Sequence, residues 1–204
     1  MHNFVIPPGL LVAGCDEAGR GCLAGPVLAA AVILPQGFSH PLIKDSKSLT
    51  HAKRMKAREI VLEVAVAWSV QAIEPAEIDM LNILKASITA MHRALDQLSP
   101  PPEYILVDGN RFIPYKNLPF RCIIKGDSLV PAISAASILA KTARDEYMTV
   151  LAREFPAYRW HKNKGYPTRE HLEALLSKGP SPHHRLSFHP AFQGLLSFPS
   201  EKRA

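Results

Sequence analysis

Four acidic residues that follow apolar stretches are the side chains of this 204-residue chain best suited to chemistry. Carboxylates that gather at one place repel each other unless a cation neutralises them, and their hard oxygen atoms favour Mg²⁺ or Mn²⁺. Two such ions about 4 Å apart can activate a water molecule and stabilise the leaving oxygen of a phosphodiester. The sequence therefore predicts a hydrolytic two-metal site formed by Asp16, Glu17, Asp108 and Asp127.

Each acid also has a purely structural interpretation when it is taken alone. Asp108 is followed by glycine, a pair that is typical of turns. Asp127 and Ser128 precede a predicted helix, where either side chain can serve as the N-cap. A shared metal site is therefore a hypothesis about the four acids as a group.

The pair Asp16 and Glu17 raises a geometrical question. Neighbouring residues on a regular strand point to opposite faces of the sheet. We expect the two carboxylates to share a site only if the strand becomes irregular at Ala18 and Gly19.

Hydrophobic periodicity predicts a mixed α/β fold. The first two apolar segments suggest a hairpin, which argues against a purely parallel sheet. We expect one structural unit, with a catalytic part in residues 1–155 and a basic helical segment in residues 156–204. Strands are predicted over residues 10–15, 27–34, 64–73, 104–107 and 122–125, and helices over residues 50–63, 75–98, 129–154 and 168–177.

Composition restricts the kind of protein but does not identify it. The formal net charge of +6 favours an anionic partner such as a nucleic acid. Three cysteines without a CxxC pair argue against a disulfide framework or structural zinc and suit a reducing compartment. Because the N-terminus lacks a signal-peptide pattern and no apolar stretch is long enough to cross a bilayer, we expect a cytoplasmic protein that does not contact membranes.

Six segments, in order along the chain, resemble the signature motifs of the ribonuclease HII family. The resemblance extends from Val12 to about Phe188 and includes all four acids. One departure is Cys22, where many members of the family carry proline. The segments are residues 16–27 (DEAGRGCLAGPV), 44–49 (KDSKSL), 107–109 (VDG), 125–128 (KGDS), 133–141 (ISAASILAK) and 164–168 (KGYPT).

The resemblance implies a ribonuclease H-like fold, with a mixed five-stranded sheet, flanking helices and a small C-terminal helical segment. It implies hydrolysis of RNA in RNA–DNA hybrids and nicking of DNA duplexes on the 5′ side of single embedded ribonucleotides, leaving 3′-hydroxyl and 5′-phosphate ends. By motif, the metal ligands would be Asp16, Glu17, Asp108 and Asp127.

The resemblance also implies a set of residues that contact substrate. Glycines let a backbone approach a ligand closely, and a 2′-hydroxyl is what distinguishes RNA from DNA. Tyr166 would stack at the RNA–DNA junction near the 2′-hydroxyl, although a packed loop anchor is an equal interpretation. Lys141 and Arg144 could face substrate or simply be solvated. The set comprises Gly19, Arg20, Gly21, Lys47, Tyr166, Ser128 and Ser137.

The C-terminal region suggests two further hypotheses. Its histidines match no metal-ligand spacing, and we expect them on a basic, solvated surface; they are His161, His171, His183, His184 and His189. Residues 193–198 (QGLLSF) loosely resemble a peptide that binds a sliding clamp. We otherwise expect a monomer.

Two other classes of protein remain open from the sequence. One is a different two-metal nuclease on the same fold, such as a type 3 ribonuclease H or a resolvase, which should lack the combination of the Gly-Arg-Gly turn and the Gly-Tyr loop. The other is a non-catalytic nucleic-acid-binding module, which the basic charge alone would permit.

Overall fold

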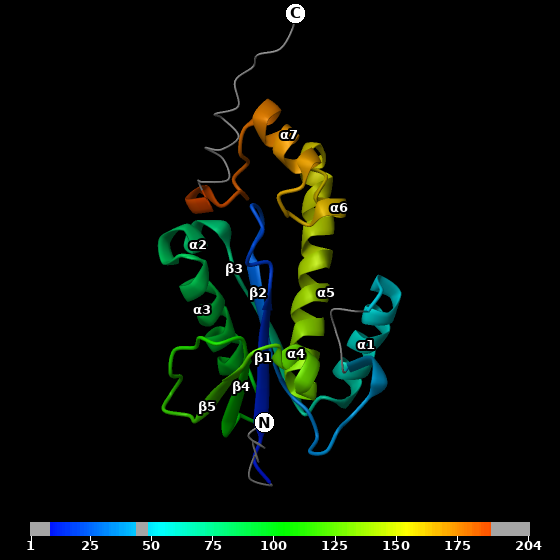
Figure 1. Ribbon diagram of the computed structural model, residues 1–204, viewed down its shortest axis with the longest axis vertical. Coiled ribbons are helices and arrows are strands. Elements are labelled where there is room, and N and C mark those ends of the chain that lie inside the picture. The colour runs from blue at the N-terminus through cyan, green and yellow to red at the C-terminus, as the bar shows by residue number, and fades with distance from the viewer. Residues whose placement is uncertain (1–8, 44–48, 189–204) are drawn as a thin grey trace, which may run out of the picture.

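The computed structural model describes residues 9–43 and 49–188, and it contains a mixed five-stranded sheet (Figure 1). The strand order is β3-β2-β1-β4-β5. Strands β1, β2 and β3 pair antiparallel, whereas β4 pairs parallel to both β1 and β5. The predicted mixed α/β fold and its N-terminal hairpin are confirmed. The strands are β1 (Val12–Ala18), β2 (Val27–Ile33), β3 (Ala67–Ile73), β4 (Tyr104–Asp108) and β5 (Phe120–Ile123).

Helices cover both faces of this sheet. In Figure 1, α2 and α3 lie on one side of the sheet, α5 and α1 lie on the other, and α6 and α7 lie at the far end of α5. None of the helices in the described residues is long and apolar enough to span a membrane. The α-helices are α1 (His51–Val64), α2 (Pro75–Leu81), α3 (Ile83–Asp96), α4 (Gly126–Leu129), α5 (Pro131–Glu154), α6 (Trp160–Asn163) and α7 (Arg169–Lys178), and the 3₁₀ turns are η1 (Pro41–Ile43), η2 (Pro156–Tyr158) and η3 (Leu186–Phe188).

Two hydrophobic clusters hold the layers together, one on each face of the sheet. Ala13 and Cys15 of β1 pack with α3, whereas Ala18 packs with α5 and α1. Every residue of strand β2, which lies between β1 and β3, is buried, because helices cover both of its faces. The alternation of side chains along β1 therefore decides which neighbouring helix each residue contacts.

Helix α5 approaches β1 so closely that one strand position has room only for glycine. A Cβ atom added to Gly14 would lie 2.2 Å from the carbonyl carbon of Ala132 and 2.4 Å from the amide nitrogen of Ile133. Real Cβ atoms do not come this close to a backbone. The start of α5 is thus held directly over β1, two residues before Asp16.

The prediction of a single helix over residues 75–98 was wrong. The segment forms α2 and α3, and Asn82 separates them with φ 67° and ψ 160°. Asn82 caps α3, because its Oδ1 accepts hydrogen bonds from the amides of Leu84 and Lys85, each at 3.1 Å. Apolar spacing continues across such a break, so periodicity alone did not reveal it.

The helix predicted over residues 129–154 is also interrupted at its start. The short helix α4 ends at Leu129, and α5 begins at Pro131. A proline disfavours the helical conformation in the residue before it, and Val130 is accordingly extended at φ −124° and ψ 117°. The break separates Asp127 from the long helix that follows.

Smaller differences concern the ends of elements. Strand β1 extends to Ala18, three residues beyond the predicted end, and β3 begins at Ala67 because α1 continues to Val64. The helix predicted from Thr50 begins one residue later, since Thr50 is its N-cap and accepts from the amide of Lys53 at 3.4 Å.

The expectation of solvated C-terminal histidines was wrong for two of them. His171 of α7 is fully buried, and His184 is 2% exposed. His161 is exposed and His183 is partly exposed, whereas His189 lies outside the described residues. Burial of the two rings follows from packing of residues 156–188 against the end of α5, which a linear sequence does not display.

We predict that the break at Asn82 depends on the cap. Asn82→Ala should lower the free energy of unfolding by about 1–2 kcal/mol, because alanine loses both cap bonds and tolerates positive φ poorly. Asn82→Gly should stay within roughly 0.5 kcal/mol of the wild type, since glycine adopts this backbone without strain. Urea denaturation measures both; equal losses in the two variants would show that backbone strain plays no part.

Candidate active site

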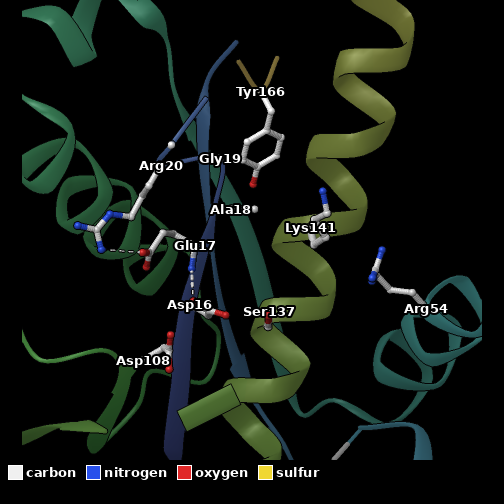
Figure 2. Close-up of a pocket in the computed structure, with 11 residues that line it drawn as sticks. Asp16, Glu17, Ala18, Gly19, Arg20, Arg54, Asp108, Ser137, Lys141 and Tyr166 are labelled. Carbon is white, nitrogen blue, oxygen red and sulfur yellow. Dashed lines mark hydrogen bonds and ion pairs between the residues drawn. The ribbon is translucent and has the colours of Figure 1, made fainter. Parts of the chain in front are cut away.

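A pocket of about 400 Å³ opens where β1 extends beyond its neighbour β4 (Figure 2). Its walls come from β1 and the turn after it, α1, α5, the end of β4, and the loop before α7. It contains most of the residues that the sequence singled out. The lining residues are Asp16, Glu17, Ala18, Gly19, Arg20, Gly21, Arg54, Asp108, Ser137, Lys141 and Tyr166.

Asp16 and Glu17 share this pocket without any irregularity in the strand. Both residues stay in regular antiparallel pairing with β2, and the pairing continues through Ala18. Their side chains leave opposite faces, but β4 pairs with β1 only as far as Cys15. The edge of β1 is open beyond that point, so both carboxylates reach the same space. The expected distortion at Ala18 and Gly19 was therefore wrong.

Asp16 lines the pocket, but only 4% of the residue is exposed. It accepts a hydrogen bond from the amide of Glu17 at 2.7 Å and is hydrogen-bonded to Ser137 of α5. Burial raises the pKa of Asp16 well above its ordinary value, and the neighbouring charges of Glu17 and Asp108 raise it further. An anion at this position is destabilised unless a positive charge joins it.

Asp108 is fixed by the start of α4. Its Oδ1 accepts from the amide of Gly126 at 2.7 Å, so the loop after β5 is bound to the end of β4. Asp127 follows directly and is 2% exposed, but it does not line the pocket. Because Lys125 occupies the N-cap position of α4, the interpretation of Asp127 or Ser128 as that cap was wrong.

The donor set fits a hard cation, although the acids do not form a closed ligand cage. Asp16, Glu17 and Asp108 line one pocket, and burial, with repulsion from the other two acids added to it, raises the pKa of Asp16. Across residues 9–43 and 49–188, no group of three or more histidine, cysteine or acidic side chains is close enough to hold a metal ion. The acids thus face a common space in an open arrangement.

Two buried arginines hold the turn after β1. Arg144 of α5 donates from Nε to the carbonyl of Pro26 at 3.0 Å and from Nη2 to that of Ala24 at 3.0 Å. Arg185 donates from Nη1 to the carbonyl of Arg20 at 3.0 Å. The interpretation of Arg144 as a substrate-facing or solvated residue was wrong, because it is fully buried and its guanidinium binds backbone.

The loop that carries Tyr166 is attached to the same turn. The amide of Leu23 donates to the carbonyl of Gly165 at 2.8 Å. Tyr166 is 42% exposed, and its hydroxyl points into the pocket in Figure 2. The Nζ of Lys141 lies 5.9 Å from the centre of its ring. The structure therefore brings Tyr166 to the same pocket as Asp16, Glu17 and Asp108.

Three cations surround the acids. Arg20 forms an ion pair with Glu17 at 3.1 Å, and Lys141 forms one with Asp145 at 2.7 Å. Arg54 of α1 also lines the pocket and was not predicted. Its position depends on how α1 packs beside α5.

The remaining predicted residues differ in position. Ser137 lines the pocket, whereas Ser128 is exposed outside it and donates to the carbonyl of Lys125 at 2.9 Å. Lys47 lies outside the described residues. Cys22 is fully buried, and burial raises the pKa of its thiol, which agrees with a packed side chain.

A mixed five-stranded sheet with carboxylates beside the end of its central parallel pair defines a nuclease of the ribonuclease H-like class. The family model described as ribonuclease HII matches residues 13–191. The chain belongs to the ribonuclease HII family, and it is a hydrolase that acts on RNA in RNA–DNA hybrids. This membership excludes the non-catalytic binding module and the sibling nucleases.

Known relatives and structures support the assignment. The chain is 56% identical over 180 residues to ribonuclease HII of Parabacteroides distasonis, an alignment that covers 88% of this chain and 90% of that protein. The fold is similar to ribonuclease H2 of Pyrococcus horikoshii, with a TM-score of 0.75, 25% identity and coverage of 92% and 99% of the two chains. It is also similar to a PCNA:RNase HII complex from Archaeoglobus fulgidus, with a TM-score of 0.70, 25% identity and coverage of 96% and 98%.

We predict that two glycines of the turn respond differently to alanine. A Cβ at Gly19 would lie 2.0 Å from Nε of Arg144, and its φ is +94°. Gly19→Ala should therefore lower the free energy of unfolding by at least about 2 kcal/mol.

Gly21→Ala is the matched control, because nothing lies within 4 Å of an added Cβ there. It should change the free energy of unfolding by less than about 0.5 kcal/mol. Chemical denaturation compares the two variants. Equal stability would mean that Arg144 does not confine the turn at Gly19.

Proposed function

We propose that this chain cleaves the phosphodiester on the 5′ side of a ribonucleotide, both in RNA–DNA hybrids and at single ribonucleotides within a DNA duplex. The products carry 3′-hydroxyl and 5′-phosphate ends. One observation carries the proposal: a single pocket contains the carboxylates of Asp16, Glu17 and Asp108, the glycine turn and the Tyr166 ring. Cleavage and recognition of a ribose are thus available within one site.

Mg²⁺ or Mn²⁺ is the proposed cofactor. Asp16, Glu17 and Asp108 would hold the ions in the pocket. Asp127 does not line the pocket, but its motif suggests that it is a further ligand. When bound, two ions would activate the attacking water and stabilise the leaving oxygen. Ser137 fixes the carboxylate of Asp16, and the amide of Gly126 fixes that of Asp108.

The turn and the loop would provide specificity. The backbone of Gly19, Arg20 and Gly21 is proposed to contact the ribose 2′-hydroxyl, and its rigidity comes from Arg144 and Arg185. A donor held in place loses little entropy when it binds, which favours discrimination by a single hydroxyl.

Several further residues are assigned proposed contacts. Tyr166 would contact the ribose from the opposite wall. Arg20, Arg54 and Lys141 would bind phosphates near the acids, and Ser128 would bind one outside the pocket. Lys47, outside the described residues, is proposed as a further phosphate contact.

The division of labour along the chain is also a proposal. Residues 1–155 would supply the acids, and residues 156–204 would support the turn and supply Tyr166. We also propose that residues 193–198, which lie outside the described residues, bind a sliding clamp. The PCNA:RNase HII complex from Archaeoglobus fulgidus supports this proposal. A monomeric state and a cytoplasmic location remain predictions.

We predict metal-dependent nicking of a DNA duplex that contains one ribonucleotide. Cleavage should occur on the 5′ side of that residue with Mg²⁺ or Mn²⁺ and stop with EDTA, and denaturing gels with end-labelled strands would locate the cut. An all-DNA duplex of the same sequence is the control and should stay intact. Cleavage of long hybrids without nicking of the single-ribonucleotide duplex would overturn the finer specificity.

We predict that Asp16→Asn and Asp127→Asn retain substrate binding but slow single-turnover cleavage at least about 100-fold, a barrier increase of roughly 2.7 kcal/mol. Glu63→Gln on the exposed face of α1 is the matched control and should cleave at the wild-type rate. Fluorescence anisotropy measures binding separately. Cleavage by Asp127→Asn at the wild-type rate would remove Asp127 from the ligand set without affecting Asp16.

A further inference from the structure

Two buried histidines, His171 and His184, meet behind the loop that carries Tyr166. Their Nε2 atoms lie 3.1 Å apart. His171 belongs to α7, and His184 follows it in the segment that pairs with Ala24 beside the glycine turn. The pair therefore lies within the C-terminal segment, next to the loop that carries Tyr166, although neither ring lines the substrate pocket.

The hydrogen bonds around the pair fix where each ring carries its proton. The amide of Ser181 donates to Nδ1 of His184 at 2.9 Å, so this atom is an acceptor. A neutral imidazole then carries its proton on the other nitrogen, and Nε2 of His184 donates to Nε2 of His171. The indole Nε1 of Trp160 donates to the same acceptor at 3.1 Å.

The opposite nitrogen of His171 completes the chain of hydrogen bonds. Since Nε2 of His171 accepts, its Nδ1 carries the proton and donates to the carbonyl of Tyr166 at 2.9 Å. The order of donation therefore runs from Ser181 through His184 and His171 to the backbone of Tyr166. Each ring must be neutral for this order to hold.

Burial keeps both rings neutral near pH 7. It lowers the pKa of His171, and it lowers the pKa of His184 to about 4, with the neighbouring rings of His171 and His183 contributing. Tyr158 packs edge-on against both rings. Protonation of His171 would place a second hydrogen between the two Nε2 atoms, and protonation of His184 would place one on Nδ1 against the amide hydrogen of Ser181.

The carbonyl that His171 holds is well placed to orient the tyrosine ring. The amide of Tyr166 donates to the carbonyl of Asn163 at 2.9 Å, and the carbonyl of Tyr166 also accepts from the amide of Thr168 at 2.8 Å. Backbone bonds thus fix both sides of the residue, while its side chain projects into the pocket (Figure 2). Movement of this carbonyl would move the ring relative to the acids.

We propose that His171 and His184 are positioning residues for substrate recognition, acting through the hydrogen bond from His171 to the carbonyl of Tyr166. This inference rests on the proposed role of Tyr166 at the ribose. If the pair were purely structural, every substitution of it would lower stability to a similar extent. If it positions Tyr166, only substitutions that remove the donor to the carbonyl of Tyr166 should impair substrate recognition.

Two substitutions at His171 separate its two nitrogens. The amide of asparagine can replace Nδ1 and still donate to the carbonyl of Tyr166, whereas that of glutamine can replace Nε2 and loses this donor. His171→Gln should lower kcat/KM on the single-ribonucleotide duplex about 10-fold, because displacement of a contacting group by a fraction of an ångström has effects of this size. His171→Asn should stay within about 3-fold of wild type.

A double-mutant cycle tests whether the effect passes through the tyrosine ring. In a Tyr166→Ala background, His171→Gln should cause no further loss of kcat/KM on the same duplex. An equal loss in both backgrounds, or equal effects of His171→Gln and His171→Asn, would overturn the proposal. Failure of the wild-type protein to nick this duplex would instead overturn the proposed function.

Wild-type protein provides a test that does not depend on folding of variants. Long-range ¹H–¹⁵N spectra of the histidine rings report which nitrogen carries the proton. At pH 7 we expect the Nδ1–H form for His171 and the Nε2–H form for His184. An Nε2–H form of His171 could not donate from Nδ1 to the carbonyl of Tyr166 and would overturn the proposal even if every variant misfolds.

Discussion

Two guanidinium groups taken out of water, those of Arg144 and Arg185, impose the constraint on which the pocket depends. A buried charge is costly unless hydrogen bonds compensate it, and each group donates two hydrogen bonds to backbone carbonyls of the turn after β1. The carbonyls of the turn must face the two arginines to accept these hydrogen bonds. This requirement fixes the backbone path of the turn. The turn can therefore be both glycine-rich and rigid, which local sequence alone would not allow.

The second constraint is a difference in strand length. Strand β1 continues beyond the last residue that β4 pairs with, so its outer edge is free where Asp16 and Glu17 stand. Side chains from opposite faces of a strand can then enter one space. The close approach of α5 at Gly14 forms the second wall and brings Ser137 to Asp16. A site with acids on both faces thus needs no distortion of the sheet.

Sequence reasoning identified the features that depend on local pattern. Apolar periodicity located all five strands, and the positions of the acids after apolar segments indicated where a site would form. It failed where one residue changes the backbone, as at Asn82 and before Pro131. It also failed for Arg144, His171 and Arg54, because the surroundings of a polar side chain depend on which distant segment packs against it. Most polar residues are exposed, so the burial of a particular one cannot be predicted before the tertiary structure is known.

The arginine contacts also have a consequence for the order of events during biosynthesis. Arg144 and Arg185 are separated from their partners in the turn by 120 and 165 positions. All four acids precede Arg185, and a chain leaves the ribosome from its N-terminus. A nascent chain therefore exposes its acidic residues while the turn still lacks one of its two supports. The turn is therefore fully supported only after Arg185 has been synthesised and has folded back onto it.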